Sequence, residues 1–98
     1  MDTRHECNGT TFIWNAAKAL VNLRKHGVSF EQACAVFFDP LVRVVDASRN
    51  EEARDAAVGY DDASRLLFVV HVMIGHDAIR IISARRATLQ ERREHDDS

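Results

Sequence analysis

The stretch IRIISARRATLQERR, residues 79–93, changes its pattern halfway from strand to helix. Its β-branched residues predict a buried strand over 79–84. Thr88 and Glu91 form a capping-box signature, so a helix is expected to begin there. Five arginines surround this corner, against one acid. Because an arginine fork matches two phosphate oxygens, the corner is a candidate phosphate-binding site. The alternative is a solvated, charged corner that covers the edge of the sheet.

Length and composition predict a single globular domain. The chain has 98 residues, of which 46% are hydrophobic and 29% charged, with a net charge of −2. A near-neutral chain has no general attraction for nucleic acid, so any such site must be a local basic patch. Cys7 and Cys34 lack disulfide or metal-ligand spacing, and Cys34 reads as a buried thiol. We expect a cytoplasmic protein without a signal peptide, membrane span, metal or cofactor.

Periodicity and capping signals divide the chain into a loose tail at 1–10 and one domain at 11–98. Asn15 is a good N-cap and Gly27 a good C′ residue for a first helix. Ser29 and Gln32 form a second capping box. The expected elements are a strand at 12–14, helices at 16–26 and from 30 to Asp39-Pro40, strands at 41–45, 56–60, 66–73 and 79–84, and a helix from Thr88.

The predicted element order is β-α-α-β-β-β-β-α. Short connections after Pro40 favour an α+β fold, in which an antiparallel meander sheet carries an N-terminal helical hairpin and a C-terminal helix on one face. In the first helix the apolar residues share one face, and polar residues lie opposite. The apolar set is Ala16, Ala19, Leu20 and Leu23, and the polar set is Lys18, Asn22 and Lys25.

Cations gather at the first helix as well as at the arginine corner. If the helical hairpin packs beside the last strands, the two groups could face one groove. Such a groove could cleave RNA without a metal, because the 2′-hydroxyl attack needs a base, an acid and cations. His26 could be the base or acid, since histidine titrates near neutrality. The alternatives are that His26 caps the helix C-terminus and that Lys25 is simply solvated.

Other polar and aromatic residues also have two readings. His71 lies in an apolar strand and reads as a hydrogen-bonded core histidine. Trp14 is either a core anchor or a platform for stacking bases, with the core favoured. Glu51, Glu52 and Arg54 could form a network, although a solvated loop is favoured.

Two longer motifs resemble a known family. FIWNAAKALVNLRKHGVSFEQA (12–33) is similar to the pattern F-x-W-x-x-x-K-x-x-x-N-x-x-K-H-G-V-x-F of BrnT toxins. IRIISARRATLQERR (79–93) resembles their R-I-I-S-A-R-x-A-x-x-x-E-R signature, and Glu52, Arg54 and Gly59 match an E-x-R…G element. The resemblance covers nearly everything after the first ten residues, and the two motifs together are specific.

The resemblance implies a RelE-like fold and a type II toxin, an endoribonuclease that stops translation. It also implies a hetero-oligomer with a BrnA-type antitoxin, a ribbon-helix-helix DNA-binding protein, so that DNA is contacted only indirectly. The alternative is a non-catalytic antitoxin-binding module that acts in operon autorepression. The expected catalytic residues are Lys25, His26, Arg54, Arg80 and Arg85, and the expected RNA-binding residues are Lys18, Arg24, Arg86 and Arg92.

Overall fold

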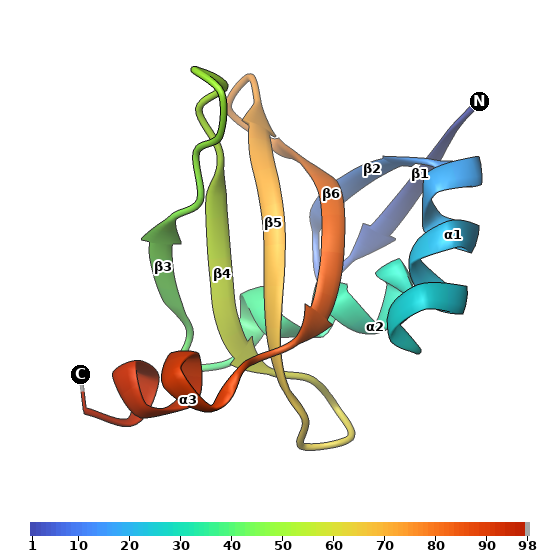
Figure 1. Ribbon diagram of the computed structural model, residues 1–98. Helices are drawn as coiled ribbons and strands as arrows, with labels where there is room; N and C mark the ends of the chain where they lie inside the picture. The colour runs from blue at the N-terminus through green and yellow to red at the C-terminus, as the bar shows by residue number, and fades with distance from the viewer. Residues whose placement is uncertain (98) are drawn as a thin grey trace.

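A mixed β-sheet forms the centre of the computed structural model, which describes residues 1–97 (Figure 1). Within this range six strands lie in the order β1-β2-β6-β5-β4-β3. Strand β6 is parallel to β2, and all other neighbours are antiparallel. The strands are β1 (Asp2–Cys7), β2 (Thr10–Asn15), β3 (Arg43–Asp46), β4 (Asp55–Tyr60), β5 (Leu66–Ile74) and β6 (Ala78–Arg86).

The predicted α+β class is confirmed, but the antiparallel meander describes only part of the sheet. Strands β3 to β6 are consecutive and antiparallel, because turns and short loops connect them. Strand β2 is far from β6 in the sequence, so no turn dictates its direction. It enters the sheet parallel to β6, pairing residues 11–13 with 78–80. The prediction of a purely antiparallel sheet was therefore wrong.

The N-terminal residues form strand β1, so the prediction of a loose tail at 1–10 was wrong. β1 pairs with β2 from Asp2 opposite Asn15 to Cys7 opposite Thr10. The strand was missed because its residues are largely polar and show no alternation of apolar and polar side chains. Asn8-Gly9 was the available signal. Both residues have positive φ (49° and 80°), as a two-residue type I′ hairpin turn requires.

The first helix begins and ends at the residues that the sequence predicted. α1 (Ala16–His26) starts at Asn15, whose side chain accepts a hydrogen bond from the backbone N–H of Lys18. It ends at Gly27, which has a left-handed φ of 69°. A side chain would be strained in this conformation, so glycine is the favoured residue.

Both predicted capping boxes are also present. Ser29 and Gln32 close the start of α2 (Phe30–Cys34), which continues as the short 3-10 helix η1 (Ala35–Phe38). Thr88 and Glu91 close the start of α3 (Leu89–Asp96). These boxes satisfy backbone N–H groups that have no partner within the helix.

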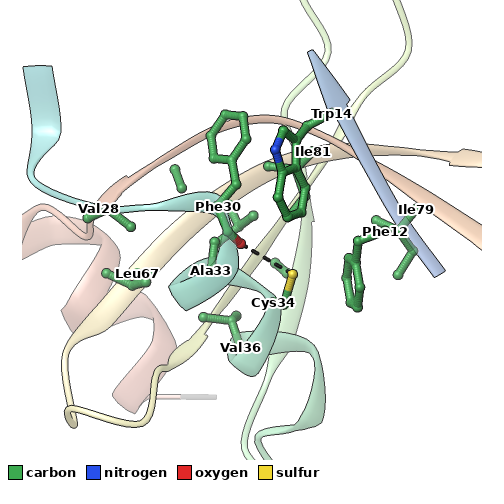
Figure 2. Packing of buried hydrophobic residues seen from close by; sticks show 13 residues of the cluster. Phe12, Trp14, Val28, Phe30, Ala33, Cys34, Val36, Leu67, Ile79 and Ile81 are labelled. Atoms are coloured by element: carbon green, nitrogen blue, oxygen red, sulfur yellow. Dashed lines mark hydrogen bonds between the residues drawn. The ribbon is translucent and has the colours of Figure 1, made fainter. Parts of the chain in front are cut away.

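The hydrophobic core lies between the sheet and α2–η1, as Figure 2 shows. Trp14 is only 2% exposed and packs edge-on against Phe30, so the core reading of Trp14 is confirmed. His71 is buried, with Nδ1 3.0 Å from the Val69 carbonyl oxygen, as expected for a core histidine. The Cys34 thiol donates to the Phe30 carbonyl (3.2 Å), and burial raises its pKa to about 12.

The helices do not share one face of the sheet, in contrast to the prediction. α2 and η1 cover the core face, which carries Leu67 and Val69 of β5. α3 covers part of the opposite face, which we call the open face (Figure 1). One cross-strand row on the open face joins four strands, because side chains alternate between the two faces. It consists of Arg43, Val58, Phe68 and Arg85.

The first helix turns toward the protein a side that lies between the two predicted faces, with Ala19 and Asn22 on it. Asn22, from the predicted polar face, is the buried residue of α1 within the described chain. Leu20 and Leu23, from the predicted apolar face, are 50% and 44% exposed. α1 therefore lies at the margin of the sheet (Figure 1), where Leu20 and Leu23 remain about half exposed to solvent.

Candidate functional site

Asn22 fastens α1 to the free edge of β6. Strand β2 pairs with β6 only through residues 78–80, so Ala84 has no neighbouring strand on that side. The Asn22 side chain makes the backbone hydrogen bonds that a neighbouring strand would otherwise make. Its Oδ1 accepts from the Ala84 N–H (3.1 Å), and its Nδ2 donates to the Ala84 carbonyl (2.8 Å) and to that of Val28 (2.9 Å). A buried asparagine thus satisfies backbone groups that would otherwise lack partners.

A groove lies between α1 and β6, and its charged lining residues are the lysines Lys18 and Lys25. Lys18, Lys25 and His26 line it from α1, and Ile82 and Ser83 line it from β6. None of its lining residues is acidic. Within residues 1–97, neither lysine nor His26 has an ion-pair partner, and the His26 ring makes no hydrogen bond. The helix-capping alternative for His26 is therefore not what the structure shows. We call this hollow the α1–β6 groove.

A β-bulge aligns three polar side chains of β6 on the open face. His71 pairs with Ile81 but Val70 pairs with Ser83, so Ile82 is the extra residue. The bulge shifts the alternation of β6 by one residue. Arg80, Ser83 and Arg85 consequently share a face. Without the bulge, Ser83 and Arg85 would point toward the core.

Arg80 is neutralised by the N-terminal strand. Its Nη2 lies 2.8 Å from Asp2 Oδ2, and its Nη1 lies 3.4 Å from Oδ1. The hydrogen bond from Arg80 is the main cause that lowers the pKa of Asp2. The guanidinium fork of Arg80 is thus occupied by a carboxylate, where the sequence suggested a phosphate.

Arg85 is held by α3 in the same way. Its Nη1 and Nη2 donate to Glu91 Oε1 (2.8 Å) and Oε2 (2.9 Å). The guanidinium carbon also lies 4.3 Å from the centre of the Phe68 ring, which adds a cation–π contact. The Arg85 hydrogen bond is the largest cause that lowers the pKa of Glu91. Glu91 therefore serves both the capping box and Arg85.

The remaining predicted arginines lie outside the α1–β6 groove. Arg54 lines a separate surface hollow and pairs with Glu52 at 2.6 Å, which confirms a local contact in that loop. Arg24 is exposed on α1, Arg86 is exposed at the end of β6, and Arg92 is half-buried on α3. The structure therefore brings together Lys18, Lys25 and His26 but does not bring Arg54 to them.

A larger cleft, of about 520 Å³, separates α3 from the open face. Its floor is apolar, with Val45, Val58 and Phe68, whereas its rim carries three carboxylates. With three carboxylates against one arginine, Arg43, this cleft is a poorer phosphate site than the α1–β6 groove of about 340 Å³. The carboxylates are Asp46, Glu91 and Glu94.

Among residues 1–97, no cluster of three or more histidine, cysteine, aspartate or glutamate side chains could hold a metal ion. In the same range, no helix is both long and apolar enough to span a membrane.

The fold defines a class of small α+β protein with a mixed sheet and a cation-lined helix at its margin. It is similar to the crystal structure of the ribonuclease toxin BrnT from Brucella abortus, with a TM-score of 0.61. The match has 23% sequence identity and covers 76% of this chain and 92% of the other. At this identity the match establishes the fold.

The family follows from the sequence. A model described as "Ribonuclease toxin, BrnT, of type II toxin-antitoxin system" matches residues 14–91. The chain belongs to this family of ribonuclease toxins, which confirms the resemblance and the endoribonuclease class. Membership implies an RNA substrate and an antitoxin partner. No curated protein matches the sequence significantly.

Proposed function

We propose that the chain is a RelE-like, metal-independent endoribonuclease whose catalytic centre is the α1–β6 groove. One observation carries the proposal: Lys18, Lys25 and His26 border Ser83 without any carboxylate in the groove lining. The two unpaired lysines attract the phosphates of RNA. Their position at the margin of the sheet leaves room for an extended strand of nucleotides.

The reaction is an internal transesterification of the RNA backbone. The 2′-hydroxyl loses its proton to a base and forms a bond to the adjacent phosphorus, and the bond to the 5′-oxygen breaks. An acid gives a proton to that leaving oxygen. His26 can fill either proton-transfer role, because imidazole exchanges protons near neutral pH. Lys25 and Lys18 stabilise the negative charge that develops on the phosphate.

The arginines extend the phosphate-binding surface beyond the groove. Arg80 and Arg85 act after RNA displaces Asp2 and Glu91 from their guanidinium groups. Arg24, Arg86 and the half-buried Arg92 contribute weaker contacts, and Arg54 contributes from the loop that leads into β4. In the cytoplasm the cleavage inhibits translation. A BrnA-type, ribbon-helix-helix antitoxin neutralises the toxin in a hetero-oligomer and links it to DNA.

Cleavage by the purified chain in the presence of EDTA tests this proposal. Fragments with cyclic phosphate and 5′-hydroxyl ends are expected, and Lys25→Ala with His26→Ala should abolish them. Intact RNA after incubation with correctly folded wild-type protein would refute the proposal. Cleavage that requires an added divalent ion would refute metal independence alone.

The second candidate is a non-catalytic module that binds the antitoxin and tunes repression. It is favoured by the internal neutralisation of Arg80 by Asp2 and of Arg85 by Glu91. This candidate predicts tight antitoxin binding, normal growth on expression of the chain alone, and no RNA fragments. Growth arrest that depends on Lys25 would exclude it.

A further inference from the structure

The guanidinium of Arg85 is bound on its edge and on its flat side by two different elements. Its Nη1 and Nη2 donate to Glu91 Oε1 (2.8 Å) and Oε2 (2.9 Å), and its central carbon lies 4.3 Å from the centre of the Phe68 ring. A carboxylate from α3 thus meets the two donors, while an aromatic ring from β5 meets the flat side. This combination suits a planar group that presents two parallel N–H donors.

The Arg80–Asp2 pair shows that not every arginine here has such a site. The Asp2 side chain is 52% exposed, whereas that of Glu91 is 21% exposed. Within residues 1–97, Arg80 also has no aromatic ring over its guanidinium. The Arg80–Asp2 contact is therefore an ordinary surface ion pair, whereas Phe68 and Glu91 form a shaped site that Arg85 occupies.

Glu91 keeps its position without Arg85. Its Oε1 also accepts a hydrogen bond from the Thr88 backbone N–H (2.9 Å), and the Thr88 hydroxyl accepts from the Glu91 N–H (3.1 Å). The Arg85 side chain, in contrast, is 34% exposed and has a long stem with many rotamers. An outside ligand can therefore replace Arg85 and meet a carboxylate that is already oriented.

The site opens into the cleft between α3 and the open face. Phe68 and Glu91 both line this cleft of about 520 Å³, and Val45 and Val58 extend its apolar floor. Its carboxylates repel phosphate, but they accept hydrogen bonds from N–H groups. A nucleobase has apolar faces and a polar edge, and proteins bind unpaired RNA bases by stacking and by hydrogen bonds to that edge. The lining therefore suits a base and not a phosphate.

Guanine is the base whose edge matches Glu91. Its N1–H and N2–H donors lie side by side, like the two N–H groups that Arg85 presents. Adenine and cytosine present one donor beside a ring-nitrogen acceptor, and uracil presents one donor between two carbonyl oxygens. Each of these acceptors would face a carboxylate oxygen, which has no proton to donate. A site that binds an N–H group discriminates strongly against an analogue that lacks it.

The position of the site on β6 connects it to the α1–β6 groove. Arg85 lies two residues after Ser83, which lines that groove, and the bulge at Ile82 places both on the open face. Two residues of a strand span about 7 Å. The groove and the cleft are therefore close enough for one short stretch of RNA to occupy both.

We infer that Phe68 and Glu91 bind a guanine base of the RNA and that this base replaces Arg85. The inference rests on the proposed function, in which RNA displaces Glu91 from Arg85. Guanine donates N1–H and N2–H to the two oxygens of Glu91, and its ring stacks on Phe68. The released Arg85 then binds a neighbouring phosphate. Recognition of the base and release of the arginine are one event.

The direct test is binding of guanosine 3′-monophosphate to the purified chain, followed by NMR of the Arg85 guanidinium. Saturable binding should shift the Arg85 N–H signals, because their carboxylate partner is lost. Inosine 3′-monophosphate lacks the 2-amino group and should bind about tenfold more weakly or less, since one hydrogen bond to a carboxylate is missing. Equal affinity for the two nucleotides, or unmoved Arg85 signals, would overturn the inference.

Glu91→Gln exchanges one acceptor oxygen for a donor, so the ratio of guanosine to inosine affinity should fall to about one. The matched control is Glu94→Gln, which makes the same change of charge on the same helix and in the same cleft, and it should keep the wild-type ratio. Equal ratios in the wild type and Glu91→Gln would contradict the inference. Phe68→Leu keeps an apolar side chain but removes the ring, so it should weaken both nucleotides and leave their ratio unchanged. Urea denaturation establishes that each variant is folded.

Cleavage assays separate this inference from the proposed function. An RNA with a single guanine should be cleaved about tenfold faster, or more, than the same RNA with hypoxanthine in its place. Equal cleavage of both would overturn the inference and leave the ribonuclease activity established. Selective binding of guanosine 3′-monophosphate without cleavage of any RNA would support the base site and refute the proposed function.

Discussion

Two groups of basic side chains border strand β6, and they differ in their partners. In the α1–β6 groove, Lys18, Lys25 and His26 lie together without an acidic lining residue. On the open face, Arg80 and Arg85 each donate two hydrogen bonds to one carboxylate, Arg80 to Asp2 and Arg85 to Glu91. A paired guanidinium must release its carboxylate before it can bind phosphate, whereas an unpaired lysine is already available. The number of arginines is therefore a poor guide to the site.

The largest expected effect is on catalysis in the groove. Lys25→Ala should lower the RNA-cleavage rate by about 100-fold or more, because a group that acts on the reacting phosphate is removed. Arg80→Ala should lower it less than about tenfold, since Arg80 is already paired with Asp2. Single-turnover cleavage assays measure both rates. Equal losses would remove the distinction between the two groups of basic side chains.

The next effect concerns the hydrogen bonds between Asn22 and Ala84, which attach α1 to β6. Asn22→Ala should lower the free energy of unfolding by about 3 kcal/mol, because it leaves the buried N–H and carbonyl of Ala84 unpaired. The control Asn15→Ala removes only a helix N-cap and should cost about 1 kcal/mol. Urea denaturation measures both. A smaller loss for Asn22→Ala than for Asn15→Ala would contradict the role given to the β6 edge.

A smaller effect is expected at the Arg85–Glu91 pair. Glu91→Gln should lower the free energy of unfolding by about 1 kcal/mol at pH 7, a value that allows for partial solvent screening of the pair. The folded-state pKa of Glu91 is lowered, chiefly by Arg85. Its stabilisation is therefore complete above the ordinary value of 4.5 and is lost as the pH falls through the lower folded value.

Urea denaturation of the wild type and Glu91→Gln between pH 7 and pH 3 measures this dependence. The two stability curves should converge as the solution becomes more acidic than the ordinary glutamate pKa of 4.5. A constant difference across the range would show that Glu91 acts only through uncharged capping contacts.

The smallest effect concerns Asp2. Asp2→Asn frees Arg80, so one more cation can contact RNA phosphate. With a non-cleavable single-stranded RNA, the slope of log affinity against log salt should steepen by about 0.7. Asp55→Asn serves as the control, because it removes an exposed acid of the same sheet that does not pair with Arg80. An unchanged slope for Asp2→Asn alone would mean that Arg80 does not reach the RNA.

Much of the fold could be predicted because its signals are local. The caps at Asn15, Ser29 and Thr88 close hydrogen bonds within three residues, so the sequence alone specifies them. The strands after Pro40 were predicted for a similar reason, since turns connect neighbours. β1 was missed because its polar residues show no apolar period, although Asn8-Gly9 indicated the hairpin.

The candidate site was predictable only in part. Lys18, Lys25 and His26 share one helix, so their proximity follows from helical geometry. Their position beside Ser83 depends on the bulge at Ile82 and on the Asn22–Ala84 bonds. Neither feature has a sequence signature in a single chain, because each depends on packing between distant segments.

The sequence by itself determined the family, through two specific motifs. It also determined the helix ends and the local charge of α1, because these depend on nearby residues. Only the tertiary structure decided which cations remain unpaired. Asp2 and Arg80 are 78 positions apart, and their contact exists because β1 pairs with β2 and β2 runs beside β6. The attraction between two charges weakens with distance. Which charges pair is therefore decided by which strands lie side by side.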